Sequence, residues 1–309
     1  FGLAPYKELG YIPAGKENYS VSKTLEYAYN DWCIAQMAGA LGKKEDSVYF
    51  AGRAGNWKNV FDPGTRFMRG RNTDGSWVKP FSALHSNHFS HPYIEGNAWQ
   101  YNWFVPHQPQ GLVAQTGGKR AFVQKLDSLF SLSQKVEGEA QSVDISGLIG
   151  QYAHGNEPSH HVAYLYAYAG APWKTQQRID TIMKTMYAAA PDGLSGNEDC
   201  GQMSAWYVFS AMGFYPVNPV GGVYVFGSPQ LDEARLQLPN GNVLKIKTKG
   251  LSPAHKYIGR ITRNGKAYTQ AWIGHHDLLQ GGTLTFYMQA RPNKELGAQA
   301  GQLPPSSIF

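Results

Sequence analysis

The stretch Asp192-Gly-Leu-Ser-Gly-Asn-Glu-Asp-Cys-Gly201 leads directly into Gln202-Met-Ser-Ala-Trp-Tyr-Val-Phe-Ser-Ala-Met-Gly213. Its first half is a glycine-rich loop with three carboxylates, Asp192, Glu198 and Asp199. The apolar spacing of the second half predicts a helix of about three turns that stops at the final glycine. Carboxylates near a helix N-terminus are favoured in their ionised form by the helix dipole, so they can bind a cation or activate a water molecule. The simpler alternative is that Asp199 only caps the helix.

Two earlier segments have the same character. Glu95 lies in Tyr93-Ile-Glu-Gly-Asn-Ala-Trp-Gln-Tyr-Asn-Trp-Phe-Val-Pro106, and Glu157 lies in Gln151-Tyr-Ala-His-Gly-Asn-Glu-Pro-Ser-His-His161. Hydrophobic periodicity predicts seven helices before the strands, starting near residues 22, 44, 96, 119, 158, 174 and 201. Because successive helices joined by short loops run antiparallel, the third, fifth and seventh should begin at one end of the bundle. The acids would then converge on one polar mouth. The odd number of helices indicates that some helices of a closed double ring are missing from this chain.

From Pro216 onward the hydrophobic period changes from that of a helix to that of a strand. The turn pairs Asn240-Gly241, Asn264-Gly265 and Gly281-Gly282 separate short β-rich runs. These runs are Val223–Phe226, Ala234–Leu238, Val243–Thr248, Tyr257–Arg263 and Thr283–Met288. The sequence therefore predicts a mainly α fold, with helices over residues 1–215 and a small all-β domain and tail over residues 216–309.

Composition excludes several functions. The chain of 309 residues has a formal net charge of +6, but its lysines and arginines are scattered along the sequence without a run, so we expect no nucleic-acid partner. No apolar run approaches the length needed to span a membrane. Cys33 and Cys200 lie far apart and outside any CxxC or zinc spacing. We expect both to be buried free thiols.

Facing carboxylates suit three roles. They can hydrolyse a glycosidic bond as an acid and a base, bind a hard cation such as calcium together with amide oxygens, or serve as caps and buried hydrogen-bond acceptors. A zinc site is disfavoured because no HExxH is present, and because the neighbours His160 and His161 would point about 100° apart on a helix. A serine nucleophile is disfavoured because the G-x-S-x-G turn is absent.

Three motifs carry a family resemblance: Glu95-Gly-Asn-Ala-Trp-Gln-Tyr101, His154-Gly-Asn-Glu-Pro-Ser-His-His161 and Gly196-Asn-Glu-Asp-Cys-Gly-Gln-Met-Ser-Ala-Trp206. Together with Ser22-Lys-Thr-Leu-Glu-Tyr-Ala-Tyr29 and Gly213-Phe-Tyr-Pro216, they resemble glycoside hydrolase family 92 over nearly the whole chain. The resemblance implies a calcium-dependent exo-α-mannosidase that inverts the anomeric centre. It also implies an N-terminal β-sandwich, an (α/α)6 catalytic barrel and a β-rich C-terminal part. The sandwich and the first barrel helices are absent from this sequence, which would be part of the (α/α)6 barrel followed by a small all-β domain.

The resemblance also implies roles for individual residues. Glu95 would be the general acid and Asp199 the base that activates water, with Glu198 as a neighbour whose share of that work the motif leaves open. The implied calcium ligands are Asn156, Glu157, Asn197 and Asp199. The implied sugar-binding residues are His154, Trp99, Asn97 and Gln100, although core packing is a competing role for Trp99.

The substrates would be mannose-containing glycans, met outside the cytoplasm by a secreted, periplasmic or cell-surface enzyme. Two other functions stay open. The chain could be a catalytically incomplete carbohydrate-binding fragment that works only beside its missing N-terminal half. It could also be another (α/α)-barrel enzyme, such as a polysaccharide lyase.

Overall fold

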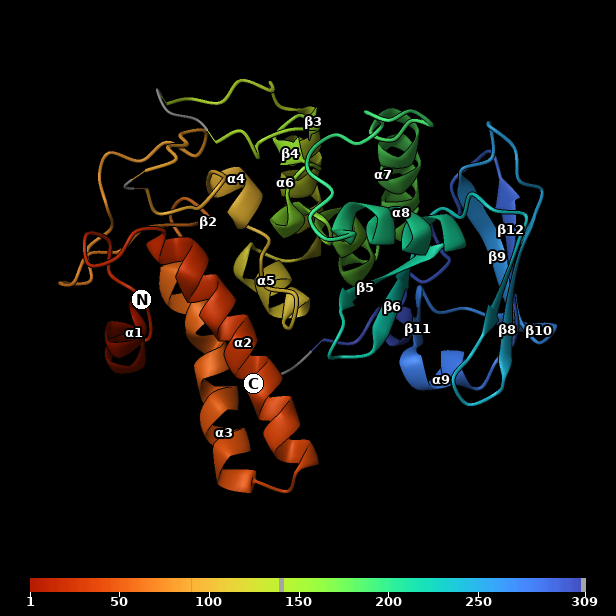
Figure 1. Cartoon of the computed structure of the whole chain (residues 1–309), viewed down its shortest axis with the longest axis horizontal. Helices are drawn as coiled ribbons and strands as arrows, with labels where there is room; N and C mark the ends of the chain where they lie inside the picture. The colour runs from red at the N-terminus through yellow and green to blue at the C-terminus, as the bar shows by residue number, and fades with distance from the viewer. Residues whose placement is uncertain (90, 139–141, 307–309) are drawn as a thin grey trace. The chain divides into compact units, whose positions relative to one another are not determined.

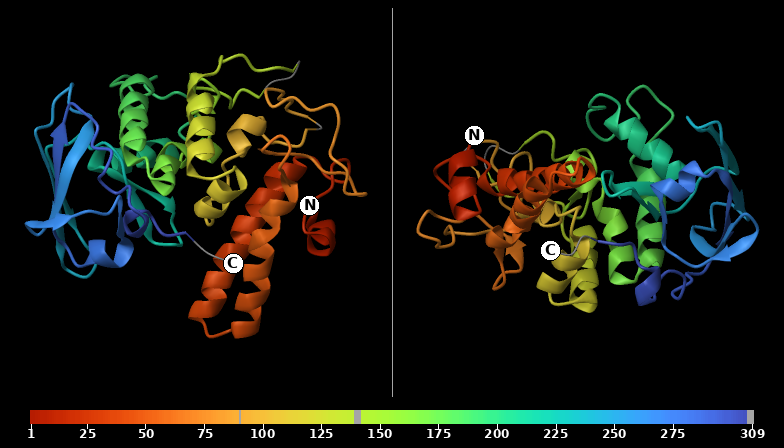
Figure 2. Two further views of the ribbon diagram at one scale, coloured as in Figure 1. Left: turned by 180° about the vertical axis from the view of Figure 1, so that it is seen from behind. Right: turned by 90° about the horizontal axis from the view of Figure 1, so that it is seen from below.

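A computed structural model describes residues 1–89, 91–138 and 142–306 of the chain (Figures 1 and 2). Two compact units emerge from its contacts. The first contains residues 1–116 and 127–159, and the second contains residues 117–126 and 160–306. The division between residues 215 and 216 that the sequence suggests stays a prediction.

The first unit begins with helix α1 (Leu3–Leu9) and a helical hairpin, made of α2 (Ser20–Ala40) and α3 (Lys44–Arg53), which continues as a 3-10 helix. Both helices of the hairpin start within two residues of the predicted positions, and they lie side by side in every view (Figures 1 and 2). Buried Asp31 joins the three helices, because its Oδ2 accepts hydrogen bonds from Tyr6 Oη at 2.9 Å and Arg53 Nε at 3.0 Å. The buried positions of α2 recur every three or four residues, as helical periodicity requires, and include Val21, Leu25, Ala28, Trp32 and Ala35.

The remainder of the first unit consists of short elements. Two antiparallel strand pairs, β1–β2 and β3–β4, accompany two short helices, and helix α6 passes from the second unit into the first. Their bounds are β1 (Phe61–Asp62), β2 (Phe67–Met68), α4 (Ala98–Tyr101), α5 (Pro109–Gln115), α6 (Lys119–Ser131), β3 (Leu148–Ile149) and β4 (Tyr152–Ala153). The helix expected to start near residue 96 begins at Ala98, directly after its cap at Asn97, and already ends at Tyr101, so α4 has only four residues.

The helix expected from Pro158 is not an α-helix. The chain there forms two 3-10 segments, η2 (Glu157–Ser159) and η3 (Val162–Ala169), and every residue of η3 is buried. Helices α7 (Pro172–Thr185) and α8 (Gln202–Met212) follow as expected, and α8 stops at Gly213 in a left-handed conformation. Because α1 and α5 are additional and η3 is not an α-helix, the count of seven helices and the parity argument built on it were wrong.

The β-rich part of the second unit contains two sheets. The five-stranded sheet has the order β10-β9-β12-β8-β7, and the three-stranded sheet the order β11-β6-β5. Strands β12 and β8 run parallel, while the other strand pairs are antiparallel. The bounds are β5 (Phe214–Asn218), β6 (Val223–Phe226), β7 (Glu233–Gln237), β8 (Val243–Lys249), β9 (Tyr257–Arg263), β10 (Lys266–Tyr268), β11 (Trp272–Gly274), α9 (His275–Leu279) and β12 (Gly282–Gln289).

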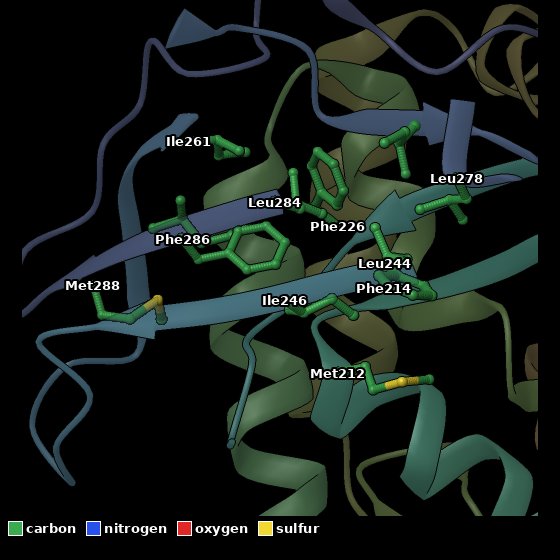
Figure 3. Packing of buried hydrophobic residues seen from close by; sticks show 12 residues of the cluster. Met212, Phe214, Phe226, Leu244, Ile246, Ile261, Leu278, Leu284, Phe286 and Met288 are labelled. Carbon is green, nitrogen blue, oxygen red and sulfur yellow. The ribbon is translucent and has the colours of Figure 1, made fainter. Parts of the chain in front are cut away.

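All five predicted strands are present, and β5, β10 and β11 are additional. The core of this part fills the space between the two sheets and the end of α8 (Figure 3). One face of the five-stranded sheet supplies alternate apolar side chains to it, among them Ile246, Leu284 and Phe286. The other sheet supplies Phe214 and Phe226. Period-2 alternation thus gives the sheet one apolar and one polar face.

Two further expectations concern the burial of the two cysteines and the absence of a membrane-spanning segment. Both thiols are free, but the expectation of burial was wrong: Cys33 is half-buried and Cys200 is exposed. Cys200 lies in a loop before α8 whose backbone is left-handed, which places it outside the packed helix. In the described part of the chain, none of the helices combines the length and the apolar character needed to cross a bilayer.

Candidate active site

Glu95 is held on a strained turn. Its φ angle of 50° places it in the left-handed region that non-glycine residues seldom adopt. The chain then enters α4 through a capping box, in which the Asn97 side chain accepts hydrogen bonds from Trp99 N at 2.9 Å and Gln100 N at 3.3 Å. The Gln100 side chain accepts one in return from Asn97 N at 2.7 Å. These reciprocal bonds fix the backbone two residues after Glu95.

A buried glutamine connects this turn to the segment of residues 151–161. Gln151 is fully buried; its Oε1 accepts a hydrogen bond from Asn97 Nδ2 at 3.1 Å, and its backbone oxygen accepts one from Gln100 Nε2 at 2.8 Å. The amides of Asn97 and Gln100, predicted to bind sugar, are thus both bonded to protein and almost completely buried. The role of these two amides in binding the sugar stays a prediction.

Asn156 and Glu95 are brought together, although 61 positions separate them. Asn156 Nδ2 lies 3.1 Å from the backbone oxygen of Glu95 and 3.4 Å from its carboxylate Oε2. Asn156 Oδ1 accepts a hydrogen bond from Glu157 N at 3.1 Å. An amide donor therefore orients one carboxyl oxygen of Glu95, while Glu157 follows directly in the chain.

The two other predicted sugar contacts pack against aromatic rings. His154 is fully buried, with Nδ1 at 2.8 Å from Tyr152 Oη and its ring stacked on the same tyrosine. Trp99 is half-buried and meets Phe67 edge to face, with ring centroids 4.9 Å apart. These contacts hold both rings in place and agree with the packing role considered for Trp99.

Glu26 was not among the residues predicted from the sequence. Burial is the main cause that raises the pKa of Tyr101, and the charges of Glu26, Glu95 and Glu157 raise it further, which places three carboxyls around this one phenol. Burial raises the pKa of Glu26 itself to about 7. The sequence contains one signal for this residue: Glu26 directly follows Leu25, which belongs to the buried apolar face of α2. A carboxyl group beside such a face has to be either paired or protonated.

The loop before α8 carries Asp199, Cys200 and Gly201 in three successive left-handed conformations, with φ angles of 49°, 57° and 90°. Glu198, and not Asp199, secures the start of the helix. Its Oε1 accepts a hydrogen bond from Ser204 N at 3.1 Å, and its Oε2 accepts one from Ser204 Oγ at 3.0 Å. The residue at the N-cap is Gly201, so the alternative that Asp199 caps the helix was wrong.

The Asp199 side chain is consequently available. It is exposed, and its carboxylate makes no hydrogen bond or ion pair with any residue that the structure describes. The start of α8 is itself anchored, because Gln202 Nε2 lies 3.1 Å from His160 Nδ1 and Trp206 Nε1 donates to His160 O at 2.9 Å. A free carboxylate on a fixed, strained loop is suited to act as a base or as a cation ligand.

Backbone strain singles out the two acids on independent grounds. Among the described residues other than glycine, only six have positive φ angles: Tyr19, Arg66, Glu95, Asp199, Cys200 and Asn264. Such conformations cost roughly 1–3 kcal/mol each and cluster at functional sites. Both predicted catalytic acids, Glu95 and Asp199, belong to this small set.

The predicted metal ligands lie in both units. Asn156 and Glu157 belong to the first, and Asn197 and Asp199 belong to the second. Within residues 1–89, 91–138 and 142–306, no three histidine, cysteine, aspartate or glutamate side chains gather closely enough to hold a metal ion by themselves.

Strained loops that present carboxylates, on a scaffold of helices with a β-rich end, fit the catalytic domain of a glycoside hydrolase. Residues 1–290 match the sequence profile of the glycosyl hydrolase family 92 catalytic domain, and the chain belongs to this family. This finding confirms the resemblance read from the three motifs.

Individual relatives agree with the family. The chain is 32% identical over 338 residues to an uncharacterized secreted glycosidase of Arthroderma benhamiae, covering 99% of this chain and 41% of that protein. A family 92 α-mannosidase of Bacteroides thetaiotaomicron, solved with mannoimidazole, superimposes with a TM-score of 0.94 at 42% identity, covering 98% of this chain and 40% of that one. A family 92 inverting mannosidase of the same species has a TM-score of 0.87 at 37% identity, with coverages of 99% and 42%. The chain thus spans about two fifths of the length of its relatives.

Proposed function

We propose that the chain carries the acid and the base of an exo-acting α-mannosidase, which removes terminal α-linked mannose from glycans in a single inverting step. The observation that carries this proposal is the strained presentation of Glu95 and Asp199, with φ angles of 50° and 49°. Two solved relatives, one described as an α-mannosidase and one as an inverting mannosidase, support the substrate and the stereochemistry.

In this mechanism Glu95, protonated at one carboxyl oxygen, donates its proton to the glycosidic oxygen as the bond to the anomeric carbon breaks. Asn156 Nδ2, at 3.4 Å from Glu95 Oε2, orients the other oxygen. Asp199 removes a proton from a water molecule that attacks the opposite face of the sugar. An inverting pair needs roughly 6.5–9.5 Å between its carboxyls to admit that water.

Asp199 is the better base of the two neighbouring acids. Both oxygens of Glu198 already accept hydrogen bonds from Ser204, whereas Asp199 is exposed and without a protein partner in the described chain. Glu198 therefore positions the loop, and Asp199 acts as the base that removes a proton from the water molecule.

The donor set fits calcium. Asn156, Glu157, Asn197 and Asp199 offer carboxylate and amide oxygens, which are ligands of hard cations, and they offer no thiolate. A calcium ion held by them would supply a positive charge that binds two hydroxyl groups of the terminal mannose. The chain's own part is to hold those oxygens in place, through the bonds that Asn156 makes with Glu95 and Glu157.

The remaining part of the enzyme would act as the partner of this chain. Because the chain spans about two fifths of its relatives, the rest of the same protein, an N-terminal β-sandwich with the first barrel helices, would complete the substrate site. The secreted relative favours a location outside the cytoplasm. The second candidate function follows from the same coverage: this chain alone would be a catalytically incomplete, carbohydrate-binding fragment.

Hydrolysis of an aryl α-mannoside tests the proposal, with the protein measured alone and together with the missing N-terminal part. Asp199→Asn should abolish turnover, while Glu198→Gln should lower it less and reduce thermal stability. Glu233→Gln, which changes an exposed strand residue, is the control. Activity of Asp199→Asn equal to that of the control would overturn the assignment of the base. Activity only with the N-terminal part added would identify the isolated chain as the incomplete fragment.

A further inference from the structure

The five-stranded sheet has an outer face that the core does not use. The side chains of Leu244, Ile246, Leu284 and Phe286 point into the core, so the alternate positions of β8 and β12 point the other way (Figure 3). In Figure 1 the inner face of this sheet is turned toward β5, β6 and β11 of the same unit. The outer face is the opposite one.

Cations that are scattered in the sequence gather on this face. Strand β8 places Lys245, Lys247 and Lys249 there in succession, spanning about 13 Å along the strand. The neighbouring strand β7 adds Arg235, and strand β9 adds Arg260. Within these fully described strands the face has one acidic side chain, that of Glu233, which pairs with Lys247 at 3.3 Å.

The charges on this face are not balanced. Arg235 stands directly opposite Lys245 in the register of β7 and β8, and like charges placed opposite each other destabilise a sheet. Arg235, Lys245 and Lys249 are exposed and form no ion pair with the residues that the structure describes. A bound polyanion would remove this repulsion.

Tyr287 shapes the centre of the face. The register places it between Lys249 of β8 and Arg260 of β9. The Arg260 guanidinium lies 3.7 Å from the centre of its ring and the Lys249 ammonium lies 5.5 Å from it. The ring therefore holds two cationic groups over the face and is itself occupied by them.

We infer that this face, defined by Arg235, Lys245, Lys247, Lys249 and Arg260, binds an acidic polysaccharide through its carboxylates. Arginine matches the geometry of a carboxylate with two parallel hydrogen bonds, and the row along β8 suits a linear chain with repeated charges. This binding site is separate from the glycosidase reaction and does not depend on it.

Two other polyanions fit less well. Single-stranded nucleic acids are held by aromatic rings that stack on bases, and the ring of Tyr287, at the centre of this face, is covered by Arg260. An anionic membrane surface is bound most strongly where apolar side chains enter it. The outward positions of β8 and β12 are mainly lysine, threonine and glutamine.

The experiment is affinity electrophoresis of the protein at 150 mM salt through gels that contain polygalacturonate, with neutral dextran as the reference gel. Lys245→Gln/Lys249→Gln is compared with Lys43→Gln/Lys44→Gln, which removes the same charge from the exposed start of α3. We expect retention by polygalacturonate only, weakened about tenfold in the sheet variant and less than twofold in the control. Both variants should melt like the parent, because the changed side chains are exposed.

Three results would overturn the inference. The first is the absence of retention by polygalacturonate. The second is an equal loss in both variants, which would mean that net charge alone is responsible. The third is tighter binding of single-stranded DNA, or of vesicles with anionic lipids, than of polygalacturonate at the same salt concentration, which would assign the face to that class of partner.

Discussion

In the proposed mechanism, the proton that Glu95 donates is needed only when the leaving group is poor. Glu95→Gln should therefore lower turnover by about 10²- to 10⁴-fold on a mannose disaccharide, the usual scale of general acid catalysis. The loss should be much smaller on an aryl mannoside with an activated leaving group. Steady-state rates on the two substrates measure the difference. Equal losses on both would contradict the role of acid.

Glu26 should make the stability of the protein depend on pH. Burial raises the pKa of this carboxyl to about 7 from a usual value of 4.5, so the folded protein holds a proton that the unfolded chain has lost. The free energy of unfolding should then fall as pH rises from about 4.5 to 7, by about 2 kcal/mol from this group. In Glu26→Gln this part of the pH dependence should disappear.

Urea denaturation at pH 5 and pH 8 measures the effect. The control is Glu8→Gln, which changes an exposed glutamate of α1. If parent and Glu26→Gln lose equal stability between the two pH values, the buried proton is not there.

At the scale of residues, the sequence indicated the acids because their chemistry is written in short motifs. Glu95 and Asp199 stand in segments rich in glycine and asparagine near predicted helix starts, and this placement predicted ionised carboxylates that can bind a cation or activate water. It could not show that Glu198 is occupied by Ser204, because the bond depends on how the loop turns back on α8. Nor could it show that Glu26 lies near Tyr101, since that contact joins segments far apart in the chain.

Among the elements, the short helix α4 depends on its cap. Asn97→Ala removes the acceptor for Trp99 N and Gln100 N and leaves Gln151 Oε1 without its donor, so it should cost about 1–3 kcal/mol of stability. Asn97→Ser keeps an oxygen acceptor at the cap and loses the amide that donates to Gln151 Oε1 and Leu84 O, so it should cost less. Thermal melting of the two variants compares these costs. Equal losses would mean that the cap contributes nothing.

The β-strands were predictable because their period and their turns agree. Turn pairs such as Asn240-Gly241 marked the boundaries, and alternation marked the faces. The segment from Val162 was mistaken for an α-helix because it is apolar throughout, which gives no period to distinguish helix types. The basic face was also invisible, because its five cations meet only through the register of β7, β8, β12 and β9.

For the whole molecule, calcium should be required for activity. The intact enzyme treated with a calcium chelator should lose mannosidase activity, regain it with calcium and not regain it with zinc, because the proposed ligands are hard oxygens. Glu157→Ala should weaken the affinity for calcium, as measured by calorimetry. Full activity in an exhaustively chelated sample, verified by metal analysis, would exclude a calcium-dependent mechanism.

We propose that Glu95 and Asp199 act together in one displacement by water. Proton NMR of the mannose released by the intact enzyme during the first minutes of hydrolysis, before mutarotation, decides whether they do. A single displacement inverts the anomeric centre, so we expect β-mannose as the first product. Initial accumulation of α-mannose would contradict it.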